Sequence, residues 1–379
     1  MPDRAYLEPR SAYIHVPFCA HRCGYCNFTL IAGRDDLIEG YLDALARELG
    51  RLERPRRVDT LFLGGGTPTH LAAEQLDRLL QLVRRWFELS PGGEFSVEAN
   101  PIDVTADRIA RLAAAGVTRL SLGAQSFATD KLRVLERDHA AHHIAQAVEL
   151  AQSALASVSL DLIFAAPGET LADWRRDLDE AVRLAPDHVS TYGLTYEKGT
   201  SYWSRRDRGE LANLPEETER AMYEAAIDTL TAAGYEHYEV SNFSRPGHRC
   251  RHNEVYWLGG TFYAAGPGAA GYEQGERRIN HRSTTTWMRR VLAGEDAVAE
   301  RETLSPEERL RERLVFGLRR IEGVDLAALS EEFELDARAL IGTPLEKLLQ
   351  YGLVRLAGDH LRLTREGLMV SDSVVGEFL

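Results

Sequence analysis

The chain has 379 residues, of which 44% are hydrophobic and 27% are charged. This composition is typical of a globular protein with one large domain or a few smaller ones, and it excludes low-complexity disorder and small disulfide scaffolds. The 45 basic residues against 58 acidic residues give a net charge of −13. Such a charge disfavours association with nucleic-acid phosphates or anionic lipids, so we expect no nucleic-acid partner.

The distribution of apolar residues shows no targeting or membrane signal. Residues 1–10 lack the apolar core of a signal peptide. No run of roughly eighteen apolar residues, the length that a transmembrane helix needs, occurs in the chain. We therefore expect a cytoplasmic protein without a transmembrane segment.

Six short apolar runs bounded by turn residues predict β-strands. They lie at residues 12–16, 59–63, 94–99, 117–123, 157–164 and 188–194. A helical pattern follows each run, such as Ile38, Leu42 and Leu45 on one face of a helix over residues 36–52. Strands that alternate with helices predict an α/β fold with parallel strands, either closed into a barrel or left as an open sheet.

The end of the chain has a different pattern. Before it, Thr105 and Gly116 are predicted to cap one helix of the region in which strands and helices alternate. We assign this whole alternating region to residues 1–240. A Gly-, His- and aromatic-rich loop segment and connection covers residues 241–304. Residues 305–379 predict three helices and a hairpin, a winged-helix-like unit. Its ten basic and fourteen acidic residues give a net charge of −4, which argues against DNA binding and favours a packing or lid role.

Polar residues cluster at the ends of the predicted strands. Glu98 and Gln125 lie near the ends of two strands, and Asp161 faces away from the apolar side of a third. A glycine run at 64–66 directly follows another strand. Because the carboxyl ends of parallel strands form one face, we expect these groups to converge on a site there.

Three of the four cysteines, Cys19, Cys23 and Cys26, lie within eight residues on the loop after the first strand. A disulfide would leave one of them unpaired, so metal ligation is the stronger interpretation. Zinc with His21 or His15 as fourth ligand is one alternative, although structural zinc sites usually bring ligands in two separated pairs. The C-x3-C-x2-C spacing favours a cubane cluster of irons and sulfides, with one iron left open for a small chelating molecule.

The cysteine loop, followed by Gly64-Gly65-Gly66-Thr67-Pro68, resembles the radical S-adenosylmethionine (SAM) superfamily. Within it, further motifs resemble the oxygen-independent coproporphyrinogen III oxidase-like family over nearly the whole chain. They are Tyr13-Ile-His-Val-Pro-Phe-Cys19, Ser96-Val-Glu98-Ala-Asn-Pro101, Gly123-Ala-Gln125-Ser-Phe127, Arg137 and Asp161-Leu-Ile-Phe-Ala-Ala-Pro167-Gly. The resemblance implies a partial (β/α)6 radical SAM barrel with a small C-terminal winged-helix-like α+β domain.

The resemblance also implies a site. Cys19, Cys23 and Cys26 would bind a 4Fe-4S cluster that holds an exchangeable SAM. The implied SAM contacts are Tyr13, Tyr25, Gly65, Gly66, Thr67, Glu98, Gln125, Arg137 and Asp161. Their chemistry suits the ligand: glycines admit a close approach, Arg137 can pair with the SAM carboxylate, and carboxylates can accept from its ammonium or ribose hydroxyls.

Two features favour the HemW-type haem chaperone subgroup. Phe28 occupies the position where coproporphyrinogen oxidases carry a fourth cysteine, and His252 to Trp257 reproduces the H-N-x-x-Y-W signature of that subgroup. His252 and Cys250, with His248 beside them, are the candidate haem ligands, because imidazole and thiolate both bind haem iron. Alternatively, the aromatic residues of this segment are core anchors and its polar residues hold a long loop over the barrel mouth. Asn27 and Ala270 depart from the pattern, since many relatives have Asp and His there.

The resemblance thus implies a haem chaperone that binds the cluster, SAM and haem, and passes haem to an unidentified acceptor protein. An electron donor such as flavodoxin or ferredoxin would reduce the cluster for cleavage of SAM. The alternatives are a radical enzyme of the coproporphyrinogen oxidase type, disfavoured by the absent fourth cysteine, a related radical methyltransferase, and a zinc-stabilised binding module.

Overall fold

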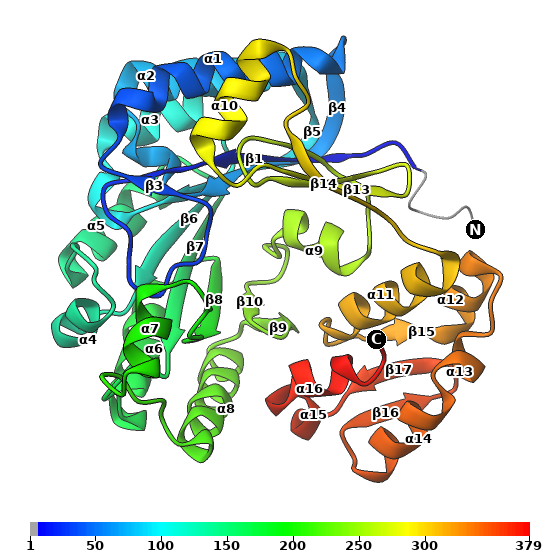
Figure 1. Ribbon diagram of the computed structural model, residues 1–379. Helices are drawn as coiled ribbons and strands as arrows, with labels where there is room; N and C mark the ends of the chain where they lie inside the picture. Colours follow the sequence, from blue (N-terminus) through cyan, green and yellow to red (C-terminus); the bar gives the residue numbers. More distant parts are fainter. Residues whose placement is uncertain (1–6) are drawn as a thin grey trace.

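One large sheet with parallel strands in its middle forms the centre of the molecule (Figure 1). The computed structural model describes residues 7–379, so residues 1–6, on which the expectation about a signal peptide rests in part, lie outside the described residues. The nine strands run in the order β11-β1-β4-β5-β6-β7-β8-β10-β9. Six of them follow the predicted runs: β1 (Ser11–Val16), β4 (Arg56–Gly65), β5 (Phe87–Ala99), β6 (Arg119–Gln125), β7 (Ser157–Phe164) and β8 (His188–Gly193). They pair in parallel, which confirms the predicted fold class.

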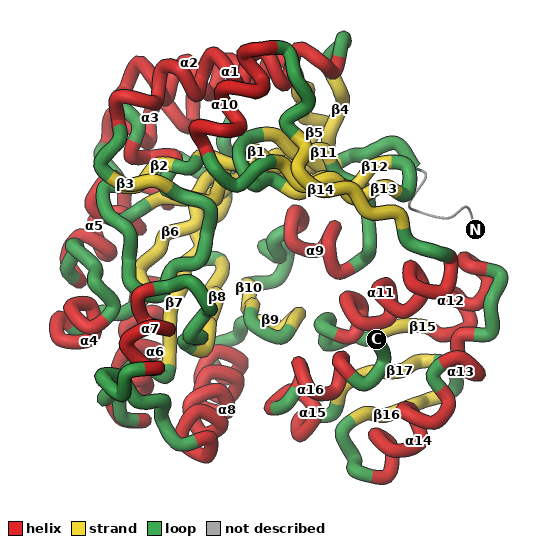
Figure 2. Tube along the Cα trace, in the orientation of Figure 1, coloured by secondary structure: helices red, strands yellow, loops and turns green. Residues whose placement is uncertain are grey.

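Helices cover the outer face of this sheet (Figure 2). They are α1 (Ile38–Leu49), α2 (Ala73–Trp86), α3 (Ala106–Ala114), α5 (Ala141–Gln152), α6 (Leu171–Leu184) and α8 (Glu216–Ala232). Leu42 and Leu45 of α1 are fully buried against the sheet, as their spacing predicts. Thr105 accepts a hydrogen bond from the backbone N–H of Arg108, and Gly116 has a φ of +83°, so both predicted caps of α3 are confirmed. No helix within residues 7–379 is long and apolar enough to cross a membrane.

Short elements surround the carboxyl ends of the parallel strands. The strands β2 (Phe18–Cys19) and β3 (Ile31–Ala32) pair in parallel at the two ends of the cysteine loop. The short helices α4 (Thr129–Val134) and α7 (Ser201–Asp207) lie beside that loop in Figure 1. The cysteine loop is therefore held at both of its ends over the mouth of the barrel.

The segment 241–304 is more regular than the predicted loop. It contributes β10 (Asn242–Ser244) and β11 (Tyr263–Ala265) to opposite sides of the main sheet, where β10 also pairs with β9 (Glu236–Glu239). It also forms α9 (Arg251–Trp257), β12 (Ala270–Glu273), β13 (Glu276–Asn280), α10 (Thr284–Ala293) and β14 (Val298–Thr303). The expectation of a loop was wrong here because these strands either have only three residues, as β10 and β11 do, or are largely polar, as β13 and β14 are, so they show no apolar run. The domain boundaries at 240 and 304 stay a prediction.

The last part of the chain has a hydrophobic core of its own. Its helices are α11 (Pro306–Leu318), α12 (Leu326–Phe333), α13 (Ala337–Leu340), α14 (Gly342–Gln350), α15 (Arg365–Met369) and α16 (Ser371–Gly376). Its sheet contains β15 (Val324–Asp325) and the predicted hairpin of β16 (Val354–Ala357) and β17 (His360–Leu363). Ser305 caps α11 by accepting from the backbone N–H of Glu308. The helix α11 of this unit lies nearest to α9 in Figure 2.

Candidate functional site

A cavity of about 470 Å³ opens at the carboxyl ends of the parallel strands, and all three clustered cysteines line it. The backbone N–H of Cys26 donates to the carbonyl of Cys23 at 3.1 Å, which forms a tight turn in the loop. Burial raises the pKa of Cys19 to about 11 and also raises that of Cys26. Since a thiol must lose its proton to bind a metal, metal binding in this cavity would release these protons.

The glycine run at residues 64–66 packs closely against β1 and the residues that follow it. A Cβ atom on Gly66 would lie 2.7 Å from the carbonyl oxygens of Val16 and Phe18, and one on Gly65 would overlap the ring of His15. Gly65 also has a φ of +106°, which disfavours any side chain. These glycines therefore let the loop approach β1, and the same packing brings Thr67 Oγ1 to 3.3 Å from Cys19 Sγ.

Two carboxyl groups, from the strands β5 and β7 on either side of β6, line the cavity. Glu98 accepts a hydrogen bond from the backbone N–H of Gly65 at 2.9 Å. Asp161 accepts from the hydroxyl of Ser121 at 3.0 Å, so it faces the interior of the barrel as its strand position predicts. Burial raises the pKa of Glu98 to about 7 and raises that of Asp161. Both groups can act as hydrogen-bond acceptors for a cationic or hydroxylated ligand.

Arg137 supplies the positive charge beside the thiols. Its Nη1 lies 3.5 Å from Cys23 Sγ, and its Nη2 donates to Asn100 Oδ1 and to the Gly123 carbonyl. The Nε atom is buried and has no hydrogen-bond partner among the residues described. Gln125, at the end of β6, has a φ of +62°, a conformation that costs free energy in a residue with a side chain. Such strain is common at ligand sites.

Of the two aromatic residues predicted to contact SAM, one lines the cavity and the other does not. Tyr25 lines the cavity and packs edge to face on Tyr202. Tyr13 does not line it; its hydroxyl lies 3.0 Å from Nδ1 of His15, below the glycine run. The structure therefore brings every predicted SAM residue except Tyr13 to one cavity with the cysteines.

Several lining residues were not predicted. Asn100 accepts from Arg137, Ser121 donates to Asp161, and Tyr192 lies at the end of β8. The motif around Glu98 already contained Asn100, and Ser121 precedes the Gln125 motif on the same strand. Tyr192 carried no comparable sequence signal, because its strand lacks a recognisable motif.

The two predicted haem ligands lie elsewhere, near the amino ends of the strands. Nδ1 of His252 is 3.1 Å from Ser11 Oγ and 3.0 Å from Thr60 Oγ1, and Nε2 is 2.8 Å from the hydroxyl of Tyr256. Burial lowers the pKa of His252 to about 3. Cys250 is buried with its Sγ 3.7 Å from Glu94 Oε1. An iron could reach His252 only after its present partners moved away, so this arrangement does not favour it as a ligand.

A barrel that carries three thiols at its carboxyl end defines the class of protein. The Radical SAM superfamily profile matches residues 13–181, and the HemN C-terminal domain profile matches residues 304–370. The fold is similar to that of coproporphyrinogen III oxidase (HemN) from Escherichia coli, a radical SAM enzyme. The TM-score is 0.87 at 22% identity, with 99% of this chain and 91% of that chain covered.

Sequence relatives narrow the class further. Proteins named heme chaperone HemW are 34% identical in Bacillus subtilis, with 98% of this chain and 99% of the relative covered. The relative in Mycobacterium tuberculosis is 39% identical, with 98% of this chain and 95% of the relative covered. The relative in Escherichia coli is 32% identical, with 98% of this chain and 99% of the relative covered. The chain belongs to the HemW family within the radical SAM superfamily. Superfamily membership implies a 4Fe-4S cluster and SAM.

The residues of the cavity fit these two groups. Three thiols face one space, and the buried Nε of Arg137 leaves a donor without an acceptor there. The zinc alternative finds less support, because Nε2 of His15 lies 2.6 Å from the Thr29 carbonyl and that of His21 lies 2.5 Å from the Glu136 carbonyl. Within residues 7–379, no three His, Cys, Asp or Glu side chains form a group that could hold a single metal ion.

Proposed function

We propose that this protein is a haem chaperone that binds haem for transfer to an acceptor protein and also binds a 4Fe-4S cluster and SAM. The observation that carries the proposal is the shared cavity of the three thiols and the polar groups at the strand ends. Its relatives in three bacteria, which are known as heme chaperones, support the haem-carrying role.

In this proposal Cys19, Cys23 and Cys26 would hold the cluster, which would bind SAM as an exchangeable ligand. When bound, the cluster supplies the electron that cleaves SAM reductively. Arg137 pairs with the SAM carboxylate and keeps positive charge beside the thiolates, while Glu98 and Asp161 accept hydrogen bonds from the ligand's ammonium or hydroxyl groups. Tyr25 offers a flat apolar surface for the adenine.

The partners follow from this chemistry. A flavodoxin or ferredoxin would deliver the electron, and an unidentified haem protein would receive the haem. We further propose that the protein acts in the cytoplasm. All four cysteines are free, and the cluster requires reduced thiols, which that compartment maintains.

The catalytic alternative is decarboxylation of coproporphyrinogen III. Phe28 lies where that enzyme type is expected to carry a further cysteine; it lines the cavity and is 57% exposed. A phenyl ring cannot supply the thiolate, so we place this alternative second.

One anaerobic experiment tests both candidates. The reconstituted protein is incubated with SAM and reductant, and haem or coproporphyrinogen III is added in parallel. We expect stoichiometric haem binding and no release of carbon dioxide from the porphyrinogen. Formation of vinyl groups with release of carbon dioxide would overturn the chaperone proposal in favour of the coproporphyrinogen oxidase alternative. If the reconstituted protein contained no more iron and sulfide than a variant lacking the three cysteines, the proposal that it binds a 4Fe-4S cluster would be overturned.

A further inference from the structure

Three buried charged residues join α4 to α6 and to the turn before α6. Nζ of Lys131 lies 2.5 Å from Glu169 and 2.9 Å from Asp177, and all three side chains are at most 6% exposed. The same Nζ lies 5.0 Å from the ring centre of Trp174. We call these three charged residues the Lys131 triad. None of them lines the cysteine cavity, so their charges act on the protein rather than on a ligand.

One carboxylate of the Lys131 triad holds the strained end of β6. Gln125, the last residue of β6, has a φ of +62°, and the register of β6 against β7 shifts just before it. The backbone N–H of Ser126 donates to the carbonyl of Ala124 at 2.7 Å, so the chain turns sharply at Gln125. Directly after this turn, Asp177 accepts from the Ser126 hydroxyl at 2.7 Å and from the backbone N–H of Phe127 at 2.8 Å. Because such strain persists only where the surroundings fix the backbone, these contacts hold the turn.

The other carboxylate holds the chain after β7 in the same way. Ala165 follows the last residue of β7 and has a φ of +63°. The backbone N–H of Ala166, the next residue, donates to Glu169 at 2.9 Å. Ile163, two residues before Ala165, lines the cavity. Lys131 therefore links strained turns at the carboxyl ends of two neighbouring strands.

The turn at Gln125 places its side chain beside that of Arg137 in the cavity. Both residues line the cavity. A Cβ on Gly123 would lie 3.0 Å from Nε2 of Gln125 and 3.5 Å from Nη2 of Arg137, so the two groups meet over this glycine. The backbone N–H of Arg137 donates to the carbonyl of Leu132, the residue after Lys131 in α4, at 2.8 Å. Both groups therefore depend on segments that Lys131 joins.

We propose that the Lys131 triad positions Gln125 and Arg137 for the recognition of SAM. The inference rests on the proposed function, in which this cavity binds SAM, and it adds residues that do not touch the ligand. Lys131 holds the two carboxylates together, and each carboxylate fixes the chain after one strand. Asp177 keeps the backbone of Gln125 in the strained conformation before SAM arrives. Such preorganisation reduces the ordering that binding would otherwise require.

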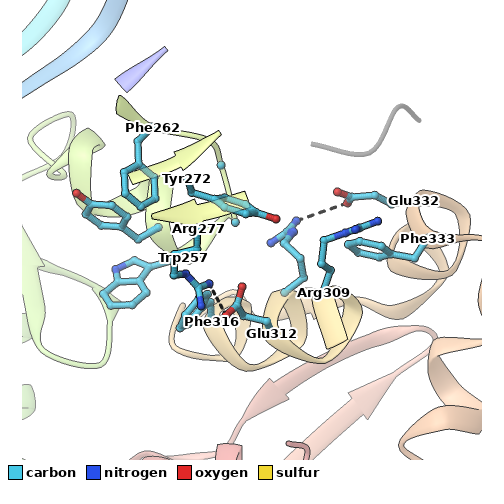
Figure 3. Close-up of a pocket in the computed structure, with 13 residues that line it drawn as sticks. Trp257, Phe262, Tyr272, Arg277, Arg309, Glu312, Phe316, Glu332 and Phe333 are labelled. Carbon is cyan, nitrogen blue, oxygen red and sulfur yellow. Dashed lines mark hydrogen bonds and ion pairs between the residues drawn. The ribbon is translucent and has the colours of Figure 1, made fainter. Parts of the chain in front are cut away.

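Other ion pairs differ from the Lys131 triad in burial or in place. In a second cavity, of about 300 Å³ between α9 and α11, Arg277 donates to Glu312 at 2.6 Å (Figure 3). These two side chains are 27% and 22% exposed, so water screens the pair. The pair of Arg119 and Glu94 matches the triad in burial, at 4% and 8% exposed. Because Arg119 begins β6 and Gln125 ends it, a change at Glu94 removes a buried charge far from the turn.

A double-mutant cycle tests this inference. The SAM Kd of the cluster-loaded protein is measured by equilibrium binding for wild type, Asp177→Asn, Gln125→Ala and the double variant. Gln125→Ala removes the amide but keeps a Cβ, so the backbone strain remains. Each single change should weaken SAM binding about tenfold. The double variant should bind SAM as Gln125→Ala does, because Asp177 acts through Gln125.

Two further variants separate positioning from loss of stability. Glu94→Gln is the matched control and should leave the SAM Kd within about twofold of wild type, although it also removes a buried charge. Ser126→Ala removes one contact to Asp177 and no charge, and it should weaken SAM binding about threefold. If Asp177→Asn does not fold, the same cycle is run with Ser126→Ala. All variants should retain stoichiometric haem binding.

Two results would overturn the positioning role while SAM binding stands. One is that the effects of Asp177→Asn and Gln125→Ala on the SAM Kd add in full. The other is that Glu94→Gln weakens SAM binding as much as Asp177→Asn does. If the wild-type protein with its cluster binds no SAM, the SAM site of the proposed function itself fails.

Discussion

The guanidinium of Arg137 lies 3.5 Å from the sulfur of Cys23, and two further contacts hold it there. Asn100 and the Gly123 carbonyl fix the other end of the guanidinium, so the positive charge stays beside the thiols. Arg137 follows α4, and Glu136 before it has a φ of +54°. A residue far from the cysteines in sequence thus becomes part of their environment.

Arg137→Gln should weaken SAM binding by at least about tenfold, because the variant loses a charged, bidentate partner for the SAM carboxylate. Equilibrium binding of SAM to the reconstituted protein measures the effect. Arg133→Gln on the exposed face of α4 serves as the control and should bind SAM as wild type does. Equal affinities in the two variants would remove Arg137 from the SAM site.

Cys250→Ser should retain the full iron and sulfide content of the reconstituted protein. Its sulfur is buried beside Glu94 and lies outside the cavity of the other thiols. Cys19→Ala, Cys23→Ala and Cys26→Ala should each lose most of the cluster. Chemical analysis of iron and sulfide separates the two groups, and a loss of iron in Cys250→Ser would show that the fourth cysteine takes part.

Lys131→Met should destabilise the fold by about 3 to 5 kcal/mol, since it leaves two buried carboxylates without their cation. Nζ of Lys131 lies 2.5 Å from Glu169 and 2.9 Å from Asp177, and all three side chains are at most 6% exposed. Urea unfolding gives the difference in free energy. Adding Glu169→Gln to the variant should restore part of the loss; no restoration would mean that the damage comes from packing rather than charge.

The buried imidazole of His252 should make folding stability depend on pH. Burial lowers its pKa from 6.5 to about 3, so the unfolded chain takes up a proton at higher pH than the folded chain. The neutral His252 ring therefore contributes fully to the free energy of unfolding above pH 6.5, and this contribution falls as the pH drops from there toward 3. Urea unfolding of wild type and His252→Gln between pH 5 and 8 should show a difference that shrinks below about pH 6.5. A difference that is constant across this range would contradict the assignment of a neutral, buried ring.

Most of the candidate site could be predicted from the sequence, because its residues occur in motifs at the ends of strands. Glu98 and Gln125 lie at the ends of β5 and β6, and Asp161 lies within β7 on the side opposite to its apolar residues, so all three reach the same cavity. Tyr13 shares the first motif but lies below the cavity. Its hydroxyl bonds to His15 inside the barrel, a contact that strand alternation alone does not reveal.

The sequence by itself determined the class of the fold and the presence of a three-thiol loop, because both depend on short-range spacing. Only the tertiary structure decided what surrounds His252. Ser11 and Thr60 come from two different strands, and together with Tyr256 they occupy both ring nitrogens. The cavity between α9 and α11 likewise exists only after the two parts of the chain pack. Such contacts join residues far apart along the chain, and local periodicity carries no information about them.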